Sequence, residues 1–182
     1  MKTSKKIVDS WLIASYRAGD KNAFSLLVKR WHVRLCKQAY WYTKDMDMAK
    51  DIVQDSWKAI MRKLHGLQDL DRFGSWALTI VRRKALDTLK KKTKQQEHLK
   101  YYKEGLTSDS TDRDEVMEKE KTMLKVMEAI NVLPTDQKEV LTLFYIEEYS
   151  LNEISEITGV SLNTIKTRLF RAREKLKVTL KK

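Results

Sequence analysis

The side chains with the most distinct chemistry lie near the carboxyl end of the sequence, on an expected helix over residues 162–180. Guanidinium, ammonium, hydroxyl and amide groups are the donors that proteins direct toward phosphates and base edges. Residues 162–182 hold eight basic residues and one acid, whereas residues 105–161 hold five basic and thirteen acidic residues. Such a step in charge on one helix favours a polyanionic ligand over a merely solvated face. The polar side chains concerned are Asn163, Thr164, Lys166, Thr167, Arg168, Arg171, Arg173 and Lys175.

The residues around this helix predict a helix-turn-helix. Ser150 followed by Glu153 makes a capping box for a short helix. Gly159 suits the positive φ that often ends a helix, and Ser161 can cap the next one. In this motif the last helix enters the major groove of DNA, although a plain helical bundle could hold the same turn. The opposite side of the last helix is expected to be buried through Leu162, Ile165, Leu169, Ala172 and Leu176.

The composition predicts an all-α protein that binds a polyanion. Among 182 residues there are one proline and five glycines, and the net charge is +12. The single cysteine, Cys36, excludes an internal disulfide and is expected to be a small core residue. The three histidines lack metal-ligand spacing, and neither a phosphate loop nor a serine elbow occurs, so no enzyme activity, metal or cofactor is predicted. No signal peptide or long apolar run is found, so we expect a cytoplasmic protein without membrane insertion.

The first half of the chain is expected to form four helices, over residues 7–18, 23–42, 46–64 and 76–92. Asp20 is expected to cap the second helix, and Ser75 the fourth, after a loop over 65–75. The inward side of the third helix should hold Ile52, Val53, Trp57, Ile60 and Leu64. That of the fourth should hold Trp76, Ile80 and Leu86 or Leu89. Tyr40, Trp41 and Tyr42 could be core residues or platforms for unpaired bases.

Two faces of this half suggest more than packing. On the third helix an outer stripe carries like charges four residues apart, which costs a few tenths of a kcal/mol and favours a basic partner surface. Its members are Asp51, Gln54, Asp55 and Lys58. On the fourth helix a crowd of cations suggests contact with phosphates, with a solvated face as the alternative. Its members are Arg82, Arg83, Lys84, Lys90, Lys91, Lys92 and the nearby Lys94.

The domain organisation follows from a loss of periodicity in the middle of the chain. Residues 93–119 are rich in Gln, Glu, Ser, Thr and Asp, which is typical of a flexible linker. Helical spacing resumes over 115–132 and leads into the second domain. We therefore expect a first domain over 1–94, a linker over 95–120 and a second domain over 121–182.

Two groups of residues, in this order, resemble the extracytoplasmic-function group of bacterial RNA polymerase sigma factors. Residues 51–57, then Phe73-x-x-Trp76 with Ile80, Arg82 and Asp87 before a basic run, look like the second conserved region of these proteins. The pattern from Leu133-Pro134 through the glycine turn to residues 164–173 looks like their fourth region. The resemblance covers almost the whole chain except the linker. It implies a four-helix region 2-like domain and a region 4-like helix-turn-helix domain.

The resemblance also implies partners and contacts. The face of Asp51, Gln54, Asp55 and Lys58 would bind core RNA polymerase. The loop over 65–75 and the fourth helix would bind the minus-ten element and a flipped base of the non-template strand. The residues implied there are Phe73, Arg82, Arg83, Lys84, Lys90 and Lys91. The last helix would read the minus-35 element of promoter DNA, with Lys166, Thr167, Phe170 and Arg171 at the contacting positions. The full set of residues implied there is Asn163, Thr164, Lys166, Thr167, Arg168, Phe170, Arg171 and Arg173.

The chain departs from the family pattern at two places. Arg83 stands where the family often has asparagine, and residues 90–92 are lysines where arginines are usual, which keeps the charge but loses the forked geometry. An anti-sigma factor is a further partner that the resemblance implies. Two other classes of protein fit parts of the sequence: a helix-turn-helix regulator that binds DNA alone, and a helical adaptor whose basic faces meet acidic proteins. The regulator leaves the stripe of Asp51 and Asp55 and the basic first domain unexplained.

Overall fold

The structure is a computed structural model that describes residues 2–99, 129–130 and 132–180. Within these ranges the chain is helical and contains no strand, as the sequence predicts. It divides into two compact units, Met1–Lys103 and Glu104–Lys182. Apart from residues 95–99, the expected linker lies outside the described residues, as does most of the helix expected over 115–132.

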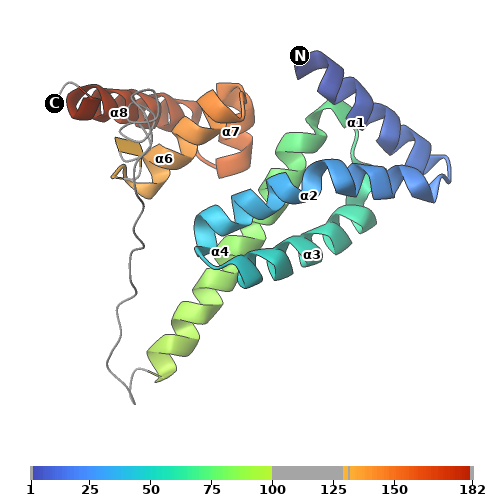
Figure 1. Cartoon of the computed structure of the whole chain (residues 1–182), viewed down its shortest axis with the longest axis horizontal. Coiled ribbons are helices and arrows are strands. Elements are labelled where there is room, and N and C mark those ends of the chain that lie inside the picture. Colours follow the sequence, from blue (N-terminus) through green and yellow to red (C-terminus); the bar gives the residue numbers. More distant parts are fainter. Residues whose placement is uncertain (1, 100–128, 131, 181–182) are drawn as a thin grey trace, which may run out of the picture. The chain divides into compact units, whose positions relative to one another are not determined.

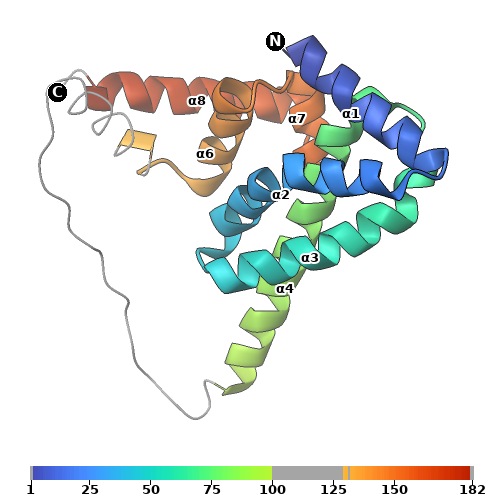
Figure 2. The ribbon, with the colours of Figure 1, turned by 45° about the vertical axis from the view of Figure 1, so that its right-hand side comes forward.

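The first unit is built from four α-helices and two short 3-10 turns (Figures 1 and 2). Helix α2 packs against all three other helices, and α3 also packs against α4. The last part of α4 runs beyond the other helices in both views. The elements are α1 (Lys2–Arg17), α2 (Lys21–Thr43), α3 (Met46–Lys63), η1 (Leu64–Gly66), η2 (Leu70–Arg72) and α4 (Phe73–Leu99).

Local capping explains where α2 and α3 begin. The Asp20 carboxylate accepts from the Asn22 amide at 2.9 Å, which confirms the expected cap of α2. The Asp45 carboxylate does the same for α3, accepting from two amides of its first turn. Arg17 joins the end of α1 to the 3-10 region, because its guanidinium donates to the carbonyl oxygens of Leu64 and Leu67 at 2.7 and 2.5 Å. The expected inward side of α3 is confirmed, since all five of its residues are buried.

The expected start of the fourth helix is wrong. Helix α4 begins at Phe73 rather than after Ser75, because the turn η2, capped by the Asp69 carboxylate, leads directly into it. Ser75 lies inside the helix, is buried, and its hydroxyl donates to the Arg72 carbonyl oxygen at 3.1 Å. The helix also continues to Leu99, beyond the expected end near residue 92.

The expected inward side of α4 is also wrong. Trp76, Ile80, Leu86 and Leu89 are only half-buried. The buried residues are Phe73, Ala77, Leu78, Val81 and Ala85, most of them four residues apart. Small alanines let two helices approach closely, so the contact face passes through them rather than through the largest side chains.

Over residues 132–180 the second unit is a helix-turn-helix preceded by helix α6. Helix α6 (Thr135–Leu141) passes into a π-helical turn, η3 (Thr142–Ile146), and then α7 (Leu151–Thr158) and α8 (Leu162–Leu180) follow. Helix α8 packs against α6 and α7. The core lies between these elements and includes Leu133, Val140, Leu141, Leu143, Ile154, Ile157, Ile165, Leu169 and Ala172.

The turn between α7 and α8 has the expected geometry. The Ser150 hydroxyl accepts from the Glu153 amide at 3.3 Å while the Glu153 carboxylate accepts from the Ser150 amide at 2.8 Å, so the capping box is confirmed. Gly159 has φ +72°, in the left-handed region that glycine adopts without a Cβ clash. The Ser161 hydroxyl accepts from the Thr164 amide at 3.3 Å and caps α8.

Candidate functional site

Helix α8 carries a buried face and an exposed polar face. Ile165, Leu169 and Ala172 are buried against α6 and α7, as expected, whereas Leu162 is 39 % exposed and lies outside the core. Of the residues that the sequence assigns to DNA, six are exposed and Thr164 is half-buried, its hydroxyl 2.9 Å from that of Ser161. The exposed residues are Asn163, Lys166, Thr167, Phe170, Arg171 and Arg173.

The arginines of α8 differ in their surroundings. Arg168 is only 25 % exposed, and its Nε lies 3.0 Å from the Asp136 carboxylate of α6 in an ion pair. Arg173 donates its Nε–H to the hydroxyl of Tyr145 at 2.7 Å. Its guanidinium also lies over the Phe144 and Tyr145 rings, 5.7 and 5.4 Å from their centroids. The sequence treats these two arginines alike, but the structure gives one a carboxylate and the other a neutral hydroxyl.

The outer stripe of α3 is exposed as expected. All four side chains, Asp51, Gln54, Asp55 and Lys58, are at the surface, opposite the buried Ile52 and Val53. The Lys58 ammonium donates to the Asp55 carboxylate at 3.0 Å. This hydrogen bond, with the charge of Lys58 and smaller effects from Lys84 and Arg62, lowers the pKa of Asp55. The hydrogen bond and these cations thus stabilise the ionised form of the Asp55 carboxyl.

The cations of α4 do not form a single face. Arg82 is half-buried, and its guanidinium lies 6.0 Å from the Tyr42 ring centroid at the end of α2. Lys84 contributes to the lowered pKa of Asp55 and so borders the stripe of α3. Two residues of helix separate these side chains by about 200° around the axis. Arg83, Lys90 and Lys91 are exposed.

Phe73 is not on a surface, although the sequence assigns it to the minus-ten contact. It is 1 % exposed. Its ring meets the Trp31 ring edge-on at 5.5 Å and 82°, and lies 6.1 Å from the Trp76 ring. The resemblance matches a phenylalanine at this position but does not indicate whether its ring is buried. Phe73 therefore belongs to the core of the first unit, and we leave it out of the proposed DNA contacts.

The aromatic residues at the end of α2 form a mixed cluster. The Trp41 and Tyr42 rings are half-buried and edge-on at 4.7 Å and 89°. The Lys44 ammonium lies 5.8 Å from the Trp41 ring centroid, while Tyr40 is exposed. Of the two roles that the sequence leaves open, a core role fits Trp41 and Tyr42 in part, because they are half-buried. The exposed Tyr40 is the one accessible to a base.

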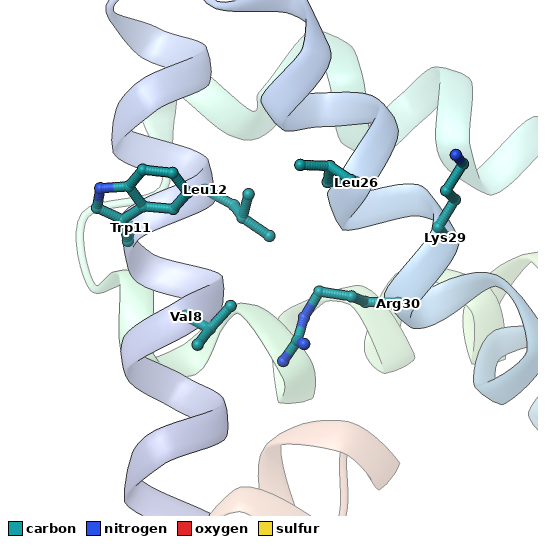
Figure 3. Close-up of a pocket in the computed structure, with 6 residues that line it drawn as sticks. All are labelled: Val8, Trp11, Leu12, Leu26, Lys29 and Arg30. Carbon is teal, nitrogen blue, oxygen red and sulfur yellow. The ribbon is translucent and has the colours of Figure 1, made fainter.

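An apolar groove lies on the outer side of α1 and α2. Figure 3 shows Val8 and Leu12 of α1 pointing toward Leu26 and Arg30 of α2. The groove has a volume of about 430 Å³, and the Arg30 Nε donates across it to the Asp9 carboxylate at 3.0 Å. Trp11, which is 63 % exposed, and the cations Lys29 and Arg30 complete the lining.

Comparison with known proteins gives the family. The sigma-70 region 2 model matches residues 27–95, and the sigma-70 region 4 model matches residues 123–176. The RNA polymerase sigma factor SigV of Bacillus subtilis is 32 % identical over 148 residues, which cover 79 % of this chain and 82 % of that protein. The ECF RNA polymerase sigma-E factor of Haemophilus influenzae is 28 % identical over 94 % of each chain. The chain belongs to the extracytoplasmic-function sigma factors. The resemblance found in the sequence is confirmed.

Solved structures agree with the fold of this sigma factor. CnrH, solved in complex with the cytosolic domain of CnrY, is 26 % identical, with a TM-score of 0.62 over 96 % of this chain and 97 % of CnrH. The sigma factor RpoE of Bartonella quintana, solved with the anti-sigma factor NepR, has a TM-score of 0.65 over 87 % of this chain and 96 % of RpoE. At 22 % identity the latter shows the fold alone. Among the described residues no helix is long and apolar enough to cross a membrane.

Sequence reasoning missed three residues that surround the polar face of α8. Asp136 pairs with Arg168, and Phe144 and Tyr145 hold Arg173. They lie 32, 29 and 28 positions before their partners. No local spacing signals such pairs; only the packing of α6 and η3 near α8 brings them together.

Proposed function

We propose that this sigma factor directs core RNA polymerase to promoters whose minus-35 element is read by α8 and whose minus-ten element is bound by the first unit. The observation that carries the proposal is the division of α8 into two faces. The buried Ile165, Leu169 and Ala172 fix the helix on its scaffold. The residues at the implied contact positions are all exposed on the rest of its surface: Lys166, Thr167, Phe170 and Arg171. These side chains offer cations, a hydroxyl and an aromatic ring to a major groove.

The outer stripe of α3 is the proposed contact with core polymerase. Asp51 and Asp55 lie one helical turn apart and are exposed, with Lys58 compensating only Asp55. Two carboxylates against one ammonium give the stripe a formal net negative charge. Charged rim groups of this kind act mainly on association rate and on choice of partner. A cationic surface on the polymerase would complement it.

The minus-ten element would meet the far side of α4. Arg83, Lys90 and Lys91 of α4 are exposed, and the last part of this helix extends beyond the other helices of the first unit (Figure 1). We assign these three to backbone phosphates. Arg82, beside the Tyr42 ring, is assigned to an unpaired base or its phosphate, since aromatic and guanidinium groups both stack on bases. Lys84 borders the polymerase-facing stripe.

The two units then act together on one promoter. When both are docked on the same polymerase, contact by one unit raises the effective concentration of the other at its element. Neither unit therefore needs high affinity for DNA by itself. Binding of the displaced strand and a flipped base would offset the few kcal/mol that unstacking costs.

Run-off transcription with core RNA polymerase on a genomic library tests this proposal. We expect start sites whose upstream sequences share two short elements at a constant separation, and co-purification of the chain with core polymerase. Promoter-specific binding by the chain alone, with no association with polymerase, would support a free helix-turn-helix regulator instead. Association with proteins but no promoter-specific transcripts would support a helical adaptor.

We also propose that an inhibitory protein, an anti-sigma factor, binds this chain. The support is the similarity to CnrH over nearly its whole length, since CnrH was solved with the cytosolic domain of a second protein. Such a partner would compete with core polymerase for the chain. Affinity capture of the tagged chain from its native cells, with and without excess core polymerase, tests this. A stoichiometric partner displaced by core enzyme supports the proposal, and capture of polymerase subunits alone contradicts it.

A further inference from the structure

Tyr145 orients the Arg173 side chain through a hydrogen bond to a neutral hydroxyl, which leaves the positive charge of Arg173 uncompensated. The Tyr145 hydroxyl accepts the single Nε–H of Arg173 at 2.7 Å. The guanidinium also lies 5.4 Å from the centroid of the same ring and 5.7 Å from that of Phe144. These two rings are edge-on to each other at 5.0 Å and 82°, so they form a corner around the arginine. A guanidinium has five N–H donors, and the Nη amino groups are those left to a ligand.

The other paired cations of α8 are held differently. Arg168 is paired with the Asp136 carboxylate at 3.0 Å, and Lys177 with the Glu174 carboxylate at 2.8 Å. A carboxylate cancels most of the field of its cation at the distance of a ligand. A neutral hydroxyl and two aromatic faces orient a guanidinium and leave its full charge. Of these three cations, Arg173 is the one whose hydrogen-bond partner is neutral, so its charge is not compensated.

The chain builds this corner with a π-helical turn. In η3 the Glu147 amide donates to the Thr142 carbonyl oxygen at 3.0 Å, five residues back, which adds one residue to the turn. Such turns are uncommon and occur frequently at functional sites. Here the turn keeps Leu143 in the core while Tyr145 remains 53 % exposed beside Arg173.

We propose that Tyr145 and Phe144 are positioning residues that orient Arg173 toward a backbone phosphate of duplex promoter DNA. This inference rests on the proposed function, because it assumes that α8 enters the groove. Arg173 lies seven residues after Lys166, about 10 Å further along the helix axis. Residues near the start of a recognition helix reach base edges, whereas flanking groups contact the backbone and set the register. Because its Nε–H is held by Tyr145 of η3, the guanidinium is anchored beside the helix, which suits a flanking phosphate better than a base edge.

Filter or anisotropy binding of the holoenzyme to a promoter fragment tests the inference, with salt varied from about 50 to 200 mM. Arg173→Ala should weaken binding and reduce the slope of log K against log salt by about 0.9, the value for one phosphate contact. Tyr145→Phe keeps the ring and removes only the hydroxyl. It should weaken binding about threefold to tenfold with the slope unchanged, because the charge remains but loses the hydrogen bond that fixes its direction.

The double variant separates positioning from a structural role. If Tyr145 acts through Arg173, Tyr145→Phe should have no further effect in the Arg173→Ala background. Relative affinity for altered minus-35 sequences should also stay unchanged, since a phosphate contact carries no base information. Lys177→Ala is the matched control, because it removes a cation of the same helix that already has a carboxylate, and its slope should stay near that of the parent.

The inference is overturned by a loss from Tyr145→Phe that persists without Arg173, by a gain in affinity from Tyr145→Phe, by a changed base preference from Arg173→Ala, or by unchanged binding of Arg173→Ala. Arg171→Ala in the same assay separates this inference from the proposed function. If Arg171→Ala weakens binding and Arg173→Ala does not, only the phosphate contact fails. If neither variant changes binding, the proposed role of α8 fails as well. Circular dichroism of each variant confirms that the helices persist.

Discussion

Replacing Phe73 by alanine is expected to destabilise the first unit by about 3–5 kcal/mol, the usual cost of removing a buried aromatic ring. The side chain is 1 % exposed, so the substitution forfeits almost all of the free energy that burying the ring provides. Its edge-on contact with Trp31 at 5.5 Å adds to this, because such pairs contribute about 0.5–1.5 kcal/mol beyond burial. Phe73→Leu keeps most of the apolar volume and loses the ring contacts, so its cost should be about 1 kcal/mol.

Tryptophan fluorescence measures this unit alone. All five tryptophans, at positions 11, 31, 41, 57 and 76, lie in the first unit. Urea unfolding followed by their emission therefore reports the first unit without interference from the second. With a slope of about 1–3 kcal/mol per molar urea, a loss of 3–5 kcal/mol lowers the midpoint by more than about 1 M.

Phe170→Ala is the matched control. It makes the same chemical change at a side chain that is 62 % exposed on α8, in the other unit, so the tryptophan-detected midpoint should not move. The reasoning is refuted if Phe73→Ala leaves the midpoint in place but abolishes promoter opening. That result would mean that the ring contacts DNA rather than supporting the core.

Three further outcomes are expected. Asp55→Lys should weaken capture of core polymerase in a pull-down, because it reverses the charge of the outer stripe; Asp47→Lys on the same helix, where Asp47 also pairs with a lysine three residues on, is the control. Glu148→Gly should raise the thermal midpoint of the second unit, since Glu148 has φ +56° and a left-handed residue with a Cβ costs about 1 kcal/mol; an unchanged or lower midpoint by circular dichroism contradicts this. Burial raises the pKa of the Cys36 thiol, so iodoacetamide at pH 8 should alkylate the native chain more slowly than the urea-unfolded chain, and equal rates would be inconsistent with that burial.

Signals that act within a few residues made the start of α2 and both ends of α7 predictable. The reciprocal bonds of Ser150 and Glu153, the Asp20 cap and the bond from the Gly159 amide to the Ser155 carbonyl oxygen all join residues at most four positions apart. Their geometry depends on the backbone of one turn, which the sequence determines almost alone. For the same reason the helix-turn-helix and the exposed stripe of α3 could be recognised before the fold was known.

The misassigned face of α4 has a different cause. Sequence periodicity weights large apolar side chains, and so it chose Trp76 and Ile80 for the core. The packed face instead follows Phe73, Ala77 and Val81, because close approach of α2 and α3 favours small residues at the crossing. Because η2 leads directly into α4, the helix begins at Phe73. Phe73 is therefore a helical residue and not part of the loop that was expected to bind the minus-ten element.

The number of basic residues in and after α8 exceeds the number available to contact DNA phosphates. Residues 162–182 hold eight basic residues, yet Arg168 and Lys177 are committed to carboxylates within the unit. A cation that must first leave a carboxylate gains less from a phosphate, and it contributes less to the salt slope. The slope for the second unit should therefore be smaller than its sequence charge implies. Because Arg173 is held by a neutral group, it should contribute fully, and the difference between it and Lys177 is what the salt titration measures.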